Sequence, residues 1–310
     1  MSSRLGSLLY VAASMVALGA GCAVPRAVPT MATTPPFSVT SRVSSPGIPT
    51  GSALTAQPTS AMATASVPRT TAAPSKTVVR SSATGATTSA AQGCGLPATL
   101  LGKDLTLVPG SAKVVALTFD AGANANGVAS ILATLAGRHV PGTFFLTGAF
   151  VEAFPADSRQ IAAAYPIGNH TQNHKDLTRL TTAGVQSEIR SGAASIQRVT
   201  GVNPRPYFRF PYGAVNARTI ATVNAECYVP FRWTVDSWGW KGTAGGMSAD
   251  EVQRRVVGAL QPGAIVLMHV GSNPDDGTTF DANALPRIID DIHAQGYTLV
   301  TLERVLPATP

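Results

Sequence analysis

The sequence predicts a parallel α/β domain that follows a disordered tether, on three grounds. The composition changes sharply near residue 93, because residues 1–93 contain no Asp or Glu and residues 94–310 hold all 16 acidic residues. From residue 114 to residue 302, short apolar runs alternate with helical patterns, which is typical of parallel strands joined by crossover helices. Reactive side chains recur where the predicted strands end, and parallel barrels build their active sites on that rim.

The first 22 residues have the pattern of an export signal. Arg4 supplies positive charge, and the apolar run at 8–18 is short for a bilayer crossing. Residues 18–22, Leu-Gly-Ala-Gly-Cys, resemble a bacterial lipobox, in which the Cys22 thiol would carry lipid and anchor the chain to the membrane. Ordinary cleavage nearby and an uncleaved anchor are the alternatives. All three place the rest of the chain outside the cytoplasm, in the cell envelope if it is anchored and secreted if it is not.

Residues 23–93 are dominated by Ser, Thr, Ala and Pro and show no sustained apolar period. Such a segment buries too little surface to offset its ordering entropy, so we expect a disordered tether that reaches across part of the cell wall. Residues 94–310 form the expected domain. Their acidic and basic residues nearly balance, so the formal net charge of +7 belongs mostly to the tether, and nucleic acid is a poor partner.

The chain has three cysteines, at positions 22, 94 and 227. If Cys22 carries lipid, Cys94 and Cys227 can pair in an oxidising compartment and staple the start of the domain to its core. Two separate thiols are the alternative. Neither residue belongs to a Cys-x-x-Cys motif, so the sequence does not predict a thiolate metal site.

In the first half of the domain, β-rich runs alternate with segments that carry apolar residues at helical spacing. The last of these segments is the most regular, because Val185, Ile189 and Ile196 fall near one face, a threonine can cap its start, and Gly201 stops it. The predicted elements are strand 114–120, helix 126–137, strand 143–147, helix 150–164, the extended run 166–170 and helix 182–200.

The second half of the domain continues the alternation with shorter elements. Ser248 can cap the start of one helix, and Gly296 can end another. An apolar strand between these two helices ends at His269. The predicted elements are strand 207–210, helix 216–223, strand 228–236, helix 249–260, strand 264–269, helix 285–295 and strand 298–302.

Five reactive side chains lie at or just past the ends of predicted strands: Asp120, His170, Arg209, Asp236 and His269. His174 follows His170 by four residues, and two imidazoles at that spacing project from one side of a helical turn, where they can grip one divalent metal. Each residue alone also has a structural explanation, such as a helix cap, a buried ion pair or a solvated histidine. Their shared placement on one rim favours a site.

Five motifs, in this order, resemble those of the polysaccharide deacetylases of the NodB-homology type, carbohydrate esterase family 4. They are Thr-Phe-Asp-Ala-Gly at 118–122, His-Thr-Gln-Asn-His at 170–174, Arg-Phe-Pro-Tyr-Gly at 209–213, Asp-Ser-Trp-Gly-Trp at 236–240 and Leu-Met-His at 267–269. The resemblance covers residues 110–306 and implies a distorted (β/α)7 barrel. It also implies metal-dependent hydrolysis of N- or O-acetyl groups on sugars.

On this resemblance, His170 and His174 hold one divalent metal, Zn²⁺ by preference and Co²⁺ or another ion as the alternative. The metal polarises the acetyl carbonyl and acidifies its bound water. Asp120 is the general base that takes the proton from that water, and Arg209 keeps the carboxylate ionised and aimed. Thr171 is expected to hydrogen-bond within the histidine motif and support it.

The resemblance also assigns the opposite side of the site. His269 is the general acid that protonates the leaving nitrogen or oxygen, and Asp236 pairs with it and raises its proton affinity. The backbone N–H of Tyr212 faces the oxyanion of the tetrahedral intermediate. Trp240 and Leu267 wall the pocket that accepts the acetyl methyl group.

Two positions depart from the family's pattern. The first motif usually carries a second acid that serves as the third metal ligand, and Ala121 stands there instead. A water, or a nearby group such as Asn124, would have to take that coordination position, so the affinity for metal should fall. Gly239 stands where the family often has Asp.

The sequence therefore predicts a hydrolase that removes acetyl groups from a cell-wall glycan, in the first place from the N-acetyl sugars of peptidoglycan. Ala121 keeps a second hypothesis open, a glycan-binding pseudo-deacetylase with weak or no hydrolysis. An esterase acting on O-acetyl xylan or a similar glycan is a third, and a purely structural tether would leave the rim residues unexplained. The loop at 271–284 is expected to set the choice of glycan, and we expect a monomer.

Overall fold

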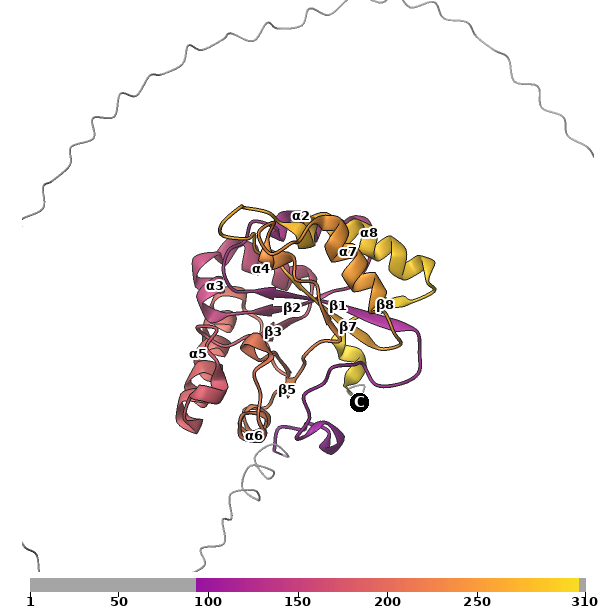
Figure 1. Cartoon of the computed structure of the whole chain (residues 1–310). Coiled ribbons are helices and arrows are strands. Elements are labelled where there is room, and N and C mark those ends of the chain that lie inside the picture. The colour runs from indigo at the N-terminus through magenta and orange to yellow at the C-terminus, as the bar shows by residue number, and fades with distance from the viewer. Residues whose placement is uncertain (1–92, 307–310) are drawn as a thin grey trace, which may run out of the picture. The chain divides into compact units, whose positions relative to one another are not determined.

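The computed structural model describes residues 93–306, and Figure 1 shows the whole chain. The predicted export signal, the lipidation of Cys22 and nearly all of the predicted tether lie outside these residues. None of the helices within this range has the length and the apolar character that a bilayer crossing requires. The membrane anchor stays a prediction.

Eight strands form one curled sheet in the order β5-β4-β3-β2-β1-β7-β6, with β8 paired to β1 beside this path. Each strand is parallel to its neighbours. The central strand β1 is buried along its whole length, as expected for a parallel strand covered on both faces. The strands are β1 Val114–Ala121, β2 Thr143–Leu146, β3 Ile167–Asn169, β4 Tyr207–Phe208, β5 Val229–Pro230, β6 Val235–Asp236, β7 Ala264–His269 and β8 Thr298–Val300.

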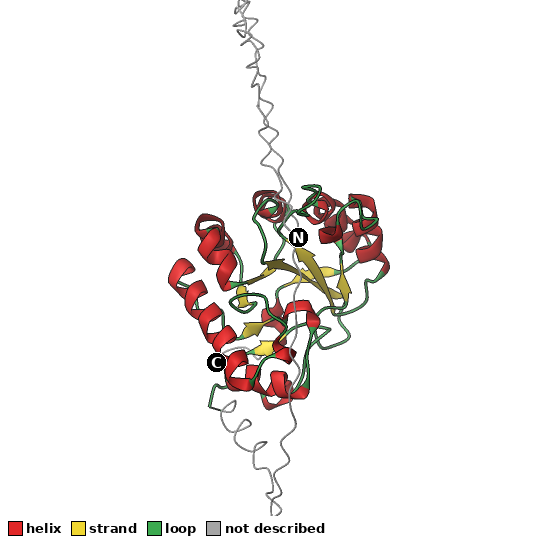
Figure 2. Ribbon diagram, turned by 60° about the vertical axis from the view of Figure 1, so that its left-hand side comes forward, coloured by secondary structure: helices red, strands yellow, loops and turns green. Residues whose placement is uncertain are grey.

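An N-terminal segment bridges part of the opening between the edges of this sheet. Leu105 pairs with Phe231, just after β5, and Leu107 pairs with Ala264 at the start of β7. The sheet is therefore a distorted, incompletely closed barrel, and its helices lie outside the curl (Figure 2). This architecture confirms the predicted α/β barrel class.

The helices pack against the sheet in two neighbouring groups. α8 packs against α7 and α2, and α5 packs against α3, α4 and α6. All of them except α6 enclose the larger apolar core together with the sheet, and α6 packs with part of α5 around a smaller cluster. The helices are α2 Val128–Gly137, α3 Gly148–Ala153, α4 Pro155–Ala164, α5 Thr182–Thr200, α6 Ala217–Ala225, α7 Ala249–Gly258 and α8 Phe280–Ala294.

Alternation along β1 decides which side chains can reach the concave side of the sheet. Phe119 and Ala121 lie in the apolar core under the helices. Ala116 lies in a second apolar cluster, to which none of the α-helices contributes a buried residue. Since side chains alternate along a strand, Asp120 shares the concave side with Ala116. Ala121 is fully buried on the opposite face of the sheet, under the helices, away from the carboxylate of Asp120.

Three predicted elements differ from the structure by more than two residues at an end. The helix predicted at 150–164 is divided into α3 and α4, because Pro155 cannot donate a backbone hydrogen bond and instead begins the second helix. The strand predicted at 228–236 is divided into β5 and β6. The helix predicted to start at Leu285 starts at Phe280, so Asp281 lies in its first turn and Pro286 inside it.

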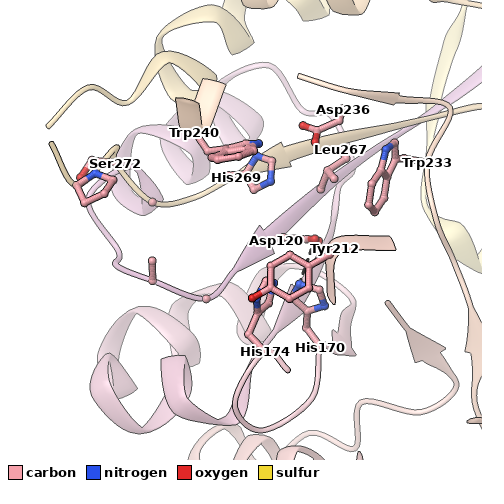
Figure 3. Close-up of a pocket in the computed structure, with 14 residues that line it drawn as sticks. Asp120, His170, His174, Tyr212, Trp233, Asp236, Trp240, Leu267, His269 and Ser272 are labelled. Atoms are coloured by element: carbon pink, nitrogen blue, oxygen red, sulfur yellow. Dashed lines mark ion pairs between the residues drawn. The ribbon is translucent and has the colours of Figure 1, made fainter. Parts of the chain in front are cut away.

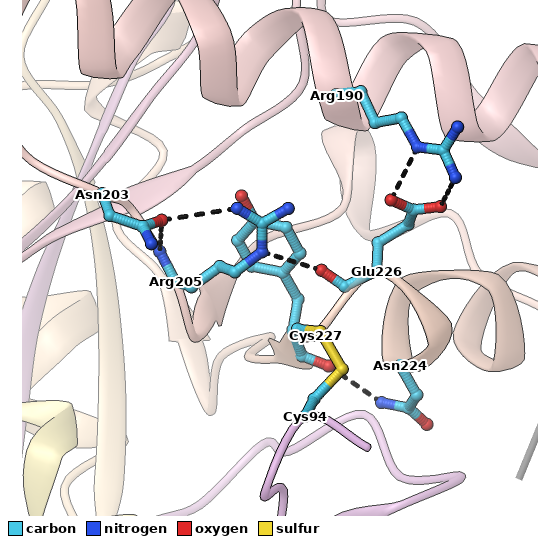
Figure 4. Close-up of a disulfide and its surroundings, with 8 residues drawn as sticks. Cys94, Arg190, Asn203, Arg205, Asn224, Glu226 and Cys227 are labelled. Atoms are coloured by element: carbon cyan, nitrogen blue, oxygen red, sulfur yellow. Dashed lines mark hydrogen bonds and ion pairs between the residues drawn. A yellow bond between two sulfur atoms is a disulfide. The ribbon is translucent and has the colours of Figure 1, made fainter. Parts of the chain in front are cut away.

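A disulfide joins Cys94 to Cys227, which are 133 residues apart (Figure 4). The pairing that the sequence allowed is therefore formed. Next to Cys227, the carboxylate of Glu226 accepts two hydrogen bonds from the guanidinium of Arg190 in α5, at 2.6 and 2.8 Å. The bridge thus ties the start of the described chain to the turn between α6 and β5.

Replacing Cys94 with alanine is expected to lower the free energy of unfolding by about 2–5 kcal/mol, because a cross-link over a long loop restricts the unfolded chain. Urea unfolding followed by circular dichroism measures this difference. Dithiothreitol should lower the stability of the wild type to the level of the variant and leave the variant unchanged. Equal stability of the oxidised wild type and the variant would contradict the assigned role.

Candidate active site

A cavity of about 670 Å³ opens at the carboxyl ends of the central strands (Figure 3). It gathers eight of the residues that the sequence assigned to the site, and Arg209 lies behind them. Asp120, the two histidines and Tyr212 face His269, Asp236 and Trp240 across the cavity. The lining residues are Asp120, Gly122, Ala123, His170, His174, Tyr212, Trp233, Asp236, Trp240, Leu267, His269, Gly271, Ser272 and Pro274.

Asp120 is the last residue but one of β1 and lies against a buried arginine. Arg209 is fully buried and donates from Nη1 to Asp120 Oδ1 at 2.8 Å, while its other nitrogens donate to the carbonyls of Phe231 and Arg232. Burial alone would raise the pKa of Asp120, but the charge of Arg209 holds that pKa below its usual value. The carboxylate is therefore ionised and aimed, as a general base must be.

The histidine motif follows β3 as a loop, so the predicted helical turn is wrong. Thr171 and His174 have positive φ angles of 70° and 54°, which a helix does not allow. The Asn169 side chain accepts a hydrogen bond from the N–H of Thr171, and the Thr171 hydroxyl accepts one from the N–H of His174. These bonds turn the chain so that the rings of His170 and His174 still meet, with centroids 4.8 Å apart.

Helix α5 holds this loop from behind. The buried carboxylate of Glu188 accepts hydrogen bonds from the backbone and the side chain of Asn173, at 2.9 and 3.0 Å. One turn further along, Gly192 leaves room for the loop: a Cβ there would lie 2.7 Å from Asn169 Oδ1 and from the carbonyl carbon of Thr171. The position of both imidazoles therefore depends on a side chain being absent at residue 192.

Gly192→Ala is expected to displace the histidine loop and to lower stability by about 1–3 kcal/mol, because the surrounding core must shift. Gly258→Ala is the matched control, since Gly258 is also helical and a Cβ there meets no atom within 4 Å. Thermal unfolding and metal affinity of both variants measure the effect. A Gly192→Ala protein with wild-type stability and metal affinity would disprove the constraint.

The two imidazoles have the chemistry of metal ligands. His170 Nδ1 donates to the carbonyl of Arg209 at 2.8 Å, so its Nε2 carries the lone pair of the neutral ring. Burial lowers the pKa of His170, and burial likewise lowers that of His174 to about 4. His170 Nε2 therefore faces Asp120 Oδ2, 3.3 Å away, as one acceptor facing another. A cation beside them would relieve this contact.

The donor set fits one divalent cation through these two imidazole nitrogens. Within residues 93–306, no three acidic, imidazole or thiol side chains converge as a complete metal site. The alternative that Asn124 supplies a ligand is wrong, because its side chain is engaged elsewhere. Asn124 Oδ1 accepts from the N–H of Ser272 at 2.8 Å, and its Nδ2 donates to the Ser272 carbonyl at 3.0 Å. Asn124 instead holds the loop that follows β7.

The opposite wall carries His269, but the predicted pairing with Asp236 is wrong. Asp236 Oδ1 accepts the N–H of Trp238 in a tight turn after β6. Asp281 Oδ2, from the first turn of α8, accepts the backbone N–H of His269 at 2.7 Å and its Nδ1–H at 3.1 Å. The early start of α8 brings this carboxylate under β7.

Burial alone would lower the pKa of His269. The hydrogen bond and the charge of Asp281, followed by the charges of Asp236 and Asp120, raise that pKa above its usual value. Asp236 itself has a raised pKa, because burial outweighs the attraction of His269. The cationic form of His269 is thus favoured, with Nε2 left to face the cavity, and this is the form a general acid needs.

Aromatic rings surround the mouth of the cavity. Tyr212 is 68% exposed, and its ring meets that of His174 at 4.6 Å between centroids. Trp240 is 48% exposed and lies 6.3 Å from the ring of His269. Leu267 is buried at the cavity wall. The predicted contacts of these residues with an oxyanion or an acetyl methyl group stay predictions.

The sequence missed two contributors to the site. Trp233 lines the cavity from the break between β5 and β6, where a continuous strand was predicted. Asp281 had no recognisable pattern, because it fell in the loop predicted at 271–284. That loop does reach the cavity, through Gly271, Ser272 and Pro274.

Known proteins resemble this chain over the same region. The model of the polysaccharide deacetylase family matches residues 108–229. A peptidoglycan-N-acetylglucosamine deacetylase of Bacillus cereus is 32% identical over 189 residues, which are 61% of this chain and 66% of that protein. A chitooligosaccharide deacetylase of Rhizobium leguminosarum bv. trifolii is 32% identical over 195 residues, 60% of this chain and 88% of that protein.

A solved structure adds a contrasting relative. A CE4 family pseudoenzyme from Bacillus anthracis is 25% identical, with a TM-score of 0.60 and coverage of 66% of this chain and 69% of that one. A mutant of that pseudoenzyme has restored enzymatic activity, and it superposes on this chain with the same TM-score. The fold is thus shared by proteins with and without catalysis.

Proposed function

The chain belongs to the polysaccharide deacetylase family of hydrolases, and we propose that it removes acetyl groups from a cell-wall glycan, in the first place the N-acetyl groups of peptidoglycan. One observation carries this proposal. An ionised carboxylate, Asp120, and a cationic imidazole, His269, face each other across one cavity, beside two neutral imidazoles. Hydrolysis of an acetyl group needs a base on one side of the carbonyl and an acid on the other.

The residues divide the reaction between the two walls of the cavity. Asp120 takes the proton of the attacking water on its carboxylate, and Arg209 keeps that carboxylate from being protonated beforehand. His269 then donates the proton on Nε2 to the leaving nitrogen. A divalent cation held by His170 and His174, Zn²⁺ by preference, would polarise the acetyl carbonyl and acidify the water. The backbone N–H of Tyr212 is proposed to stabilise the oxyanion.

The surroundings of the site suit a sugar polymer. Leu267 and Trp240 are proposed to enclose the acetyl methyl group, and the exposed ring of Tyr212 offers a face on which a sugar can lie. A second cavity of about 590 Å³ shares His174 and Tyr212 with the first and is also lined by Lys175 and Arg179. A chain of sugars can therefore extend beyond the reacting unit on this side.

Ala121 favours a second candidate, a glycan-binding domain without hydrolysis. Its methyl group lies in the apolar core, so it contributes no ligand, and one relative is a pseudoenzyme. Against this candidate stands the buried Asp120–Arg209 pair together with His269 and Asp281. Buried charges are costly, and binding alone would not require them in this arrangement.

Acetate release tests the proposal. The full chain is incubated with peptidoglycan, chito-oligomers and acetylated xylan, each with Zn²⁺, with Co²⁺ and with chelator. We expect release from peptidoglycan or chito-oligomers that depends on the added metal. Release from xylan alone would identify an O-acetyl esterase. Retained glycan binding without release under any metal would identify a pseudo-deacetylase and overturn the proposed activity.

We also propose that the protein works in the cell envelope as a monomer, anchored by lipid on Cys22. The pattern of residues 1–22 and the Cys94–Cys227 disulfide support an oxidising location outside the cytoplasm. Fractionation of cells that express the wild type or Cys22→Ala tests the anchor. Loss of the protein from the membrane fraction in the variant is the expected result.

A further inference from the structure

The carboxylate that holds His269 comes from an unexpected part of the chain. Asp281 lies in the first turn of α8 and is 2% exposed. Its Oδ2 accepts both the backbone N–H and the Nδ1–H of His269. This arrangement fixes the ring: Nδ1 carries a proton toward Asp281, and Nε2 points the other way.

Gly239 makes room for this carboxylate. A Cβ built on Gly239 would lie 2.2 Å from Asp281 Oδ1 and 3.0 Å from the backbone nitrogen of Asp281. The φ angle of Gly239 is outside the left-handed region, so the backbone itself does not demand glycine. Any side chain at residue 239 and the present position of Asp281 therefore exclude one another.

The position of Asp281 and the glycine at residue 239 depend on each other. A carboxylate from α8 fills the space that a side chain at residue 239 would take. Asp281 Oδ1 is buried and has no hydrogen-bond partner within the described residues, so its placement serves no other visible contact. A half-satisfied buried carboxylate is costly unless a cation lies beside it.

We propose that Asp281 is the positioning residue of the general acid His269, and that it occupies the space that an acid at residue 239 would need. This inference rests on the proposed deacetylase function. Three carboxylates face His269: Asp281 from α8, Asp236 from β6 and Asp120 from β1. Of these, Asp281 is the one hydrogen-bonded to the ring, so it sets both the tautomer and the direction of Nε2.

Asp281→Asn tests the role with little change of shape. The general acid must be protonated, so activity is lost as the pH rises through the pKa of His269. Loss of the Asp281 charge should move this basic limb to lower pH by about one unit. We expect kcat to fall at least roughly tenfold, a part of the roughly 10²–10⁴-fold that a positioned acid contributes, with KM little changed. Asp290→Asn, an exposed carboxylate of the same helix, is the control and should leave both unchanged.

Moving the carboxylate from residue 281 to residue 239 distinguishes a positioning role of Asp281 from a contribution to stability alone. Asp281→Ala should lose activity, and Gly239→Asp alone should also lose it, because the two carboxylates compete for one space. The double variant Asp281→Ala with Gly239→Asp should recover at least roughly tenfold over Asp281→Ala and regain the basic limb of the wild type. A purely structural Asp281 would give no such recovery.

A direct titration of His269 tests this inference independently of the proposed deacetylase activity. The His269 ring is followed by NMR in the full chain, and the His269→Gln variant identifies its signal. We expect the pKa of His269 to fall by about one unit in Asp281→Asn. If the wild type releases no acetate under any metal, the proposed function fails and this titration still decides the role of Asp281. An unchanged pKa of His269 in Asp281→Asn would overturn the inference.

Discussion

His170→Ala is expected to abolish acetate release, to below roughly one thousandth of the wild-type rate, because it removes one of two nitrogens that hold the metal. His170 is 2% exposed, and its ring is fixed by the Arg209 carbonyl, so a water has little freedom to replace it. The variant also loses the contact of Nε2 with Asp120. The measurement is acetate release with bound metal determined on the same samples.

His293→Ala is the matched control for His170→Ala. His293 is an exposed histidine in α8 and belongs to none of the five motifs, so its removal should change neither metal content nor rate. Near-normal turnover of His170→Ala would refute the metal assignment. Loss of activity with full metal content would instead show that His170 has a role in the reaction other than metal binding.

Asp120→Asn is expected to lower kcat by roughly 10²–10⁴-fold while metal binding persists, because an amide cannot accept the proton of the attacking water. The amide oxygen can still accept the hydrogen bond of Arg209, so the side chain should keep its place. The charge of Arg209 would then lie buried without its partner, which costs up to about 3–5 kcal/mol of stability. Acetate release, metal content and urea unfolding are measured together.

Asp104→Asn separates the loss of a base from the loss of a buried charge. Asp104 is a buried carboxylate that faces Arg232 at 2.7 Å and is outside the cavity lining. This control should keep its kcat at a temperature where it is folded. If Asp120→Asn loses both fold and metal, Asp120 is a structural residue and the proposed base must be another group.

Local patterns in the sequence were sufficient to predict which strand ends carry the site. Strands that end in Asp120 and His269 were predicted because continuous apolar runs stop at those residues, and a parallel sheet brings such ends to one edge. The pairing of Asp120 with Arg209 was also expected, since a carboxylate and a guanidinium at one rim attract each other. The structure places Asp120 opposite His269 in the register of β1 and β7.

The start of one helix and the conformation of the histidine motif were predicted wrongly. The sequence placed the start of α8 at Leu285, and the structure starts it at Phe280, with Pro286 inside the helix. That difference of five residues moved Asp281 from a predicted loop into the site. The histidine spacing likewise predicted a helical turn, and the side chains of Asn169 and Thr171 instead shape a loop.

The sequence by itself determined the α/β class, the rim on which chemistry is placed and most of the residues on it. These depend on apolar periodicity and on motif order, which are local properties of the chain. Only the tertiary structure decided that Asp281 holds His269, that Asn124 holds the loop after β7, and that Ala121 points into the core. Each of these depends on which groups far apart in sequence fill the same space, and packing alone settles that.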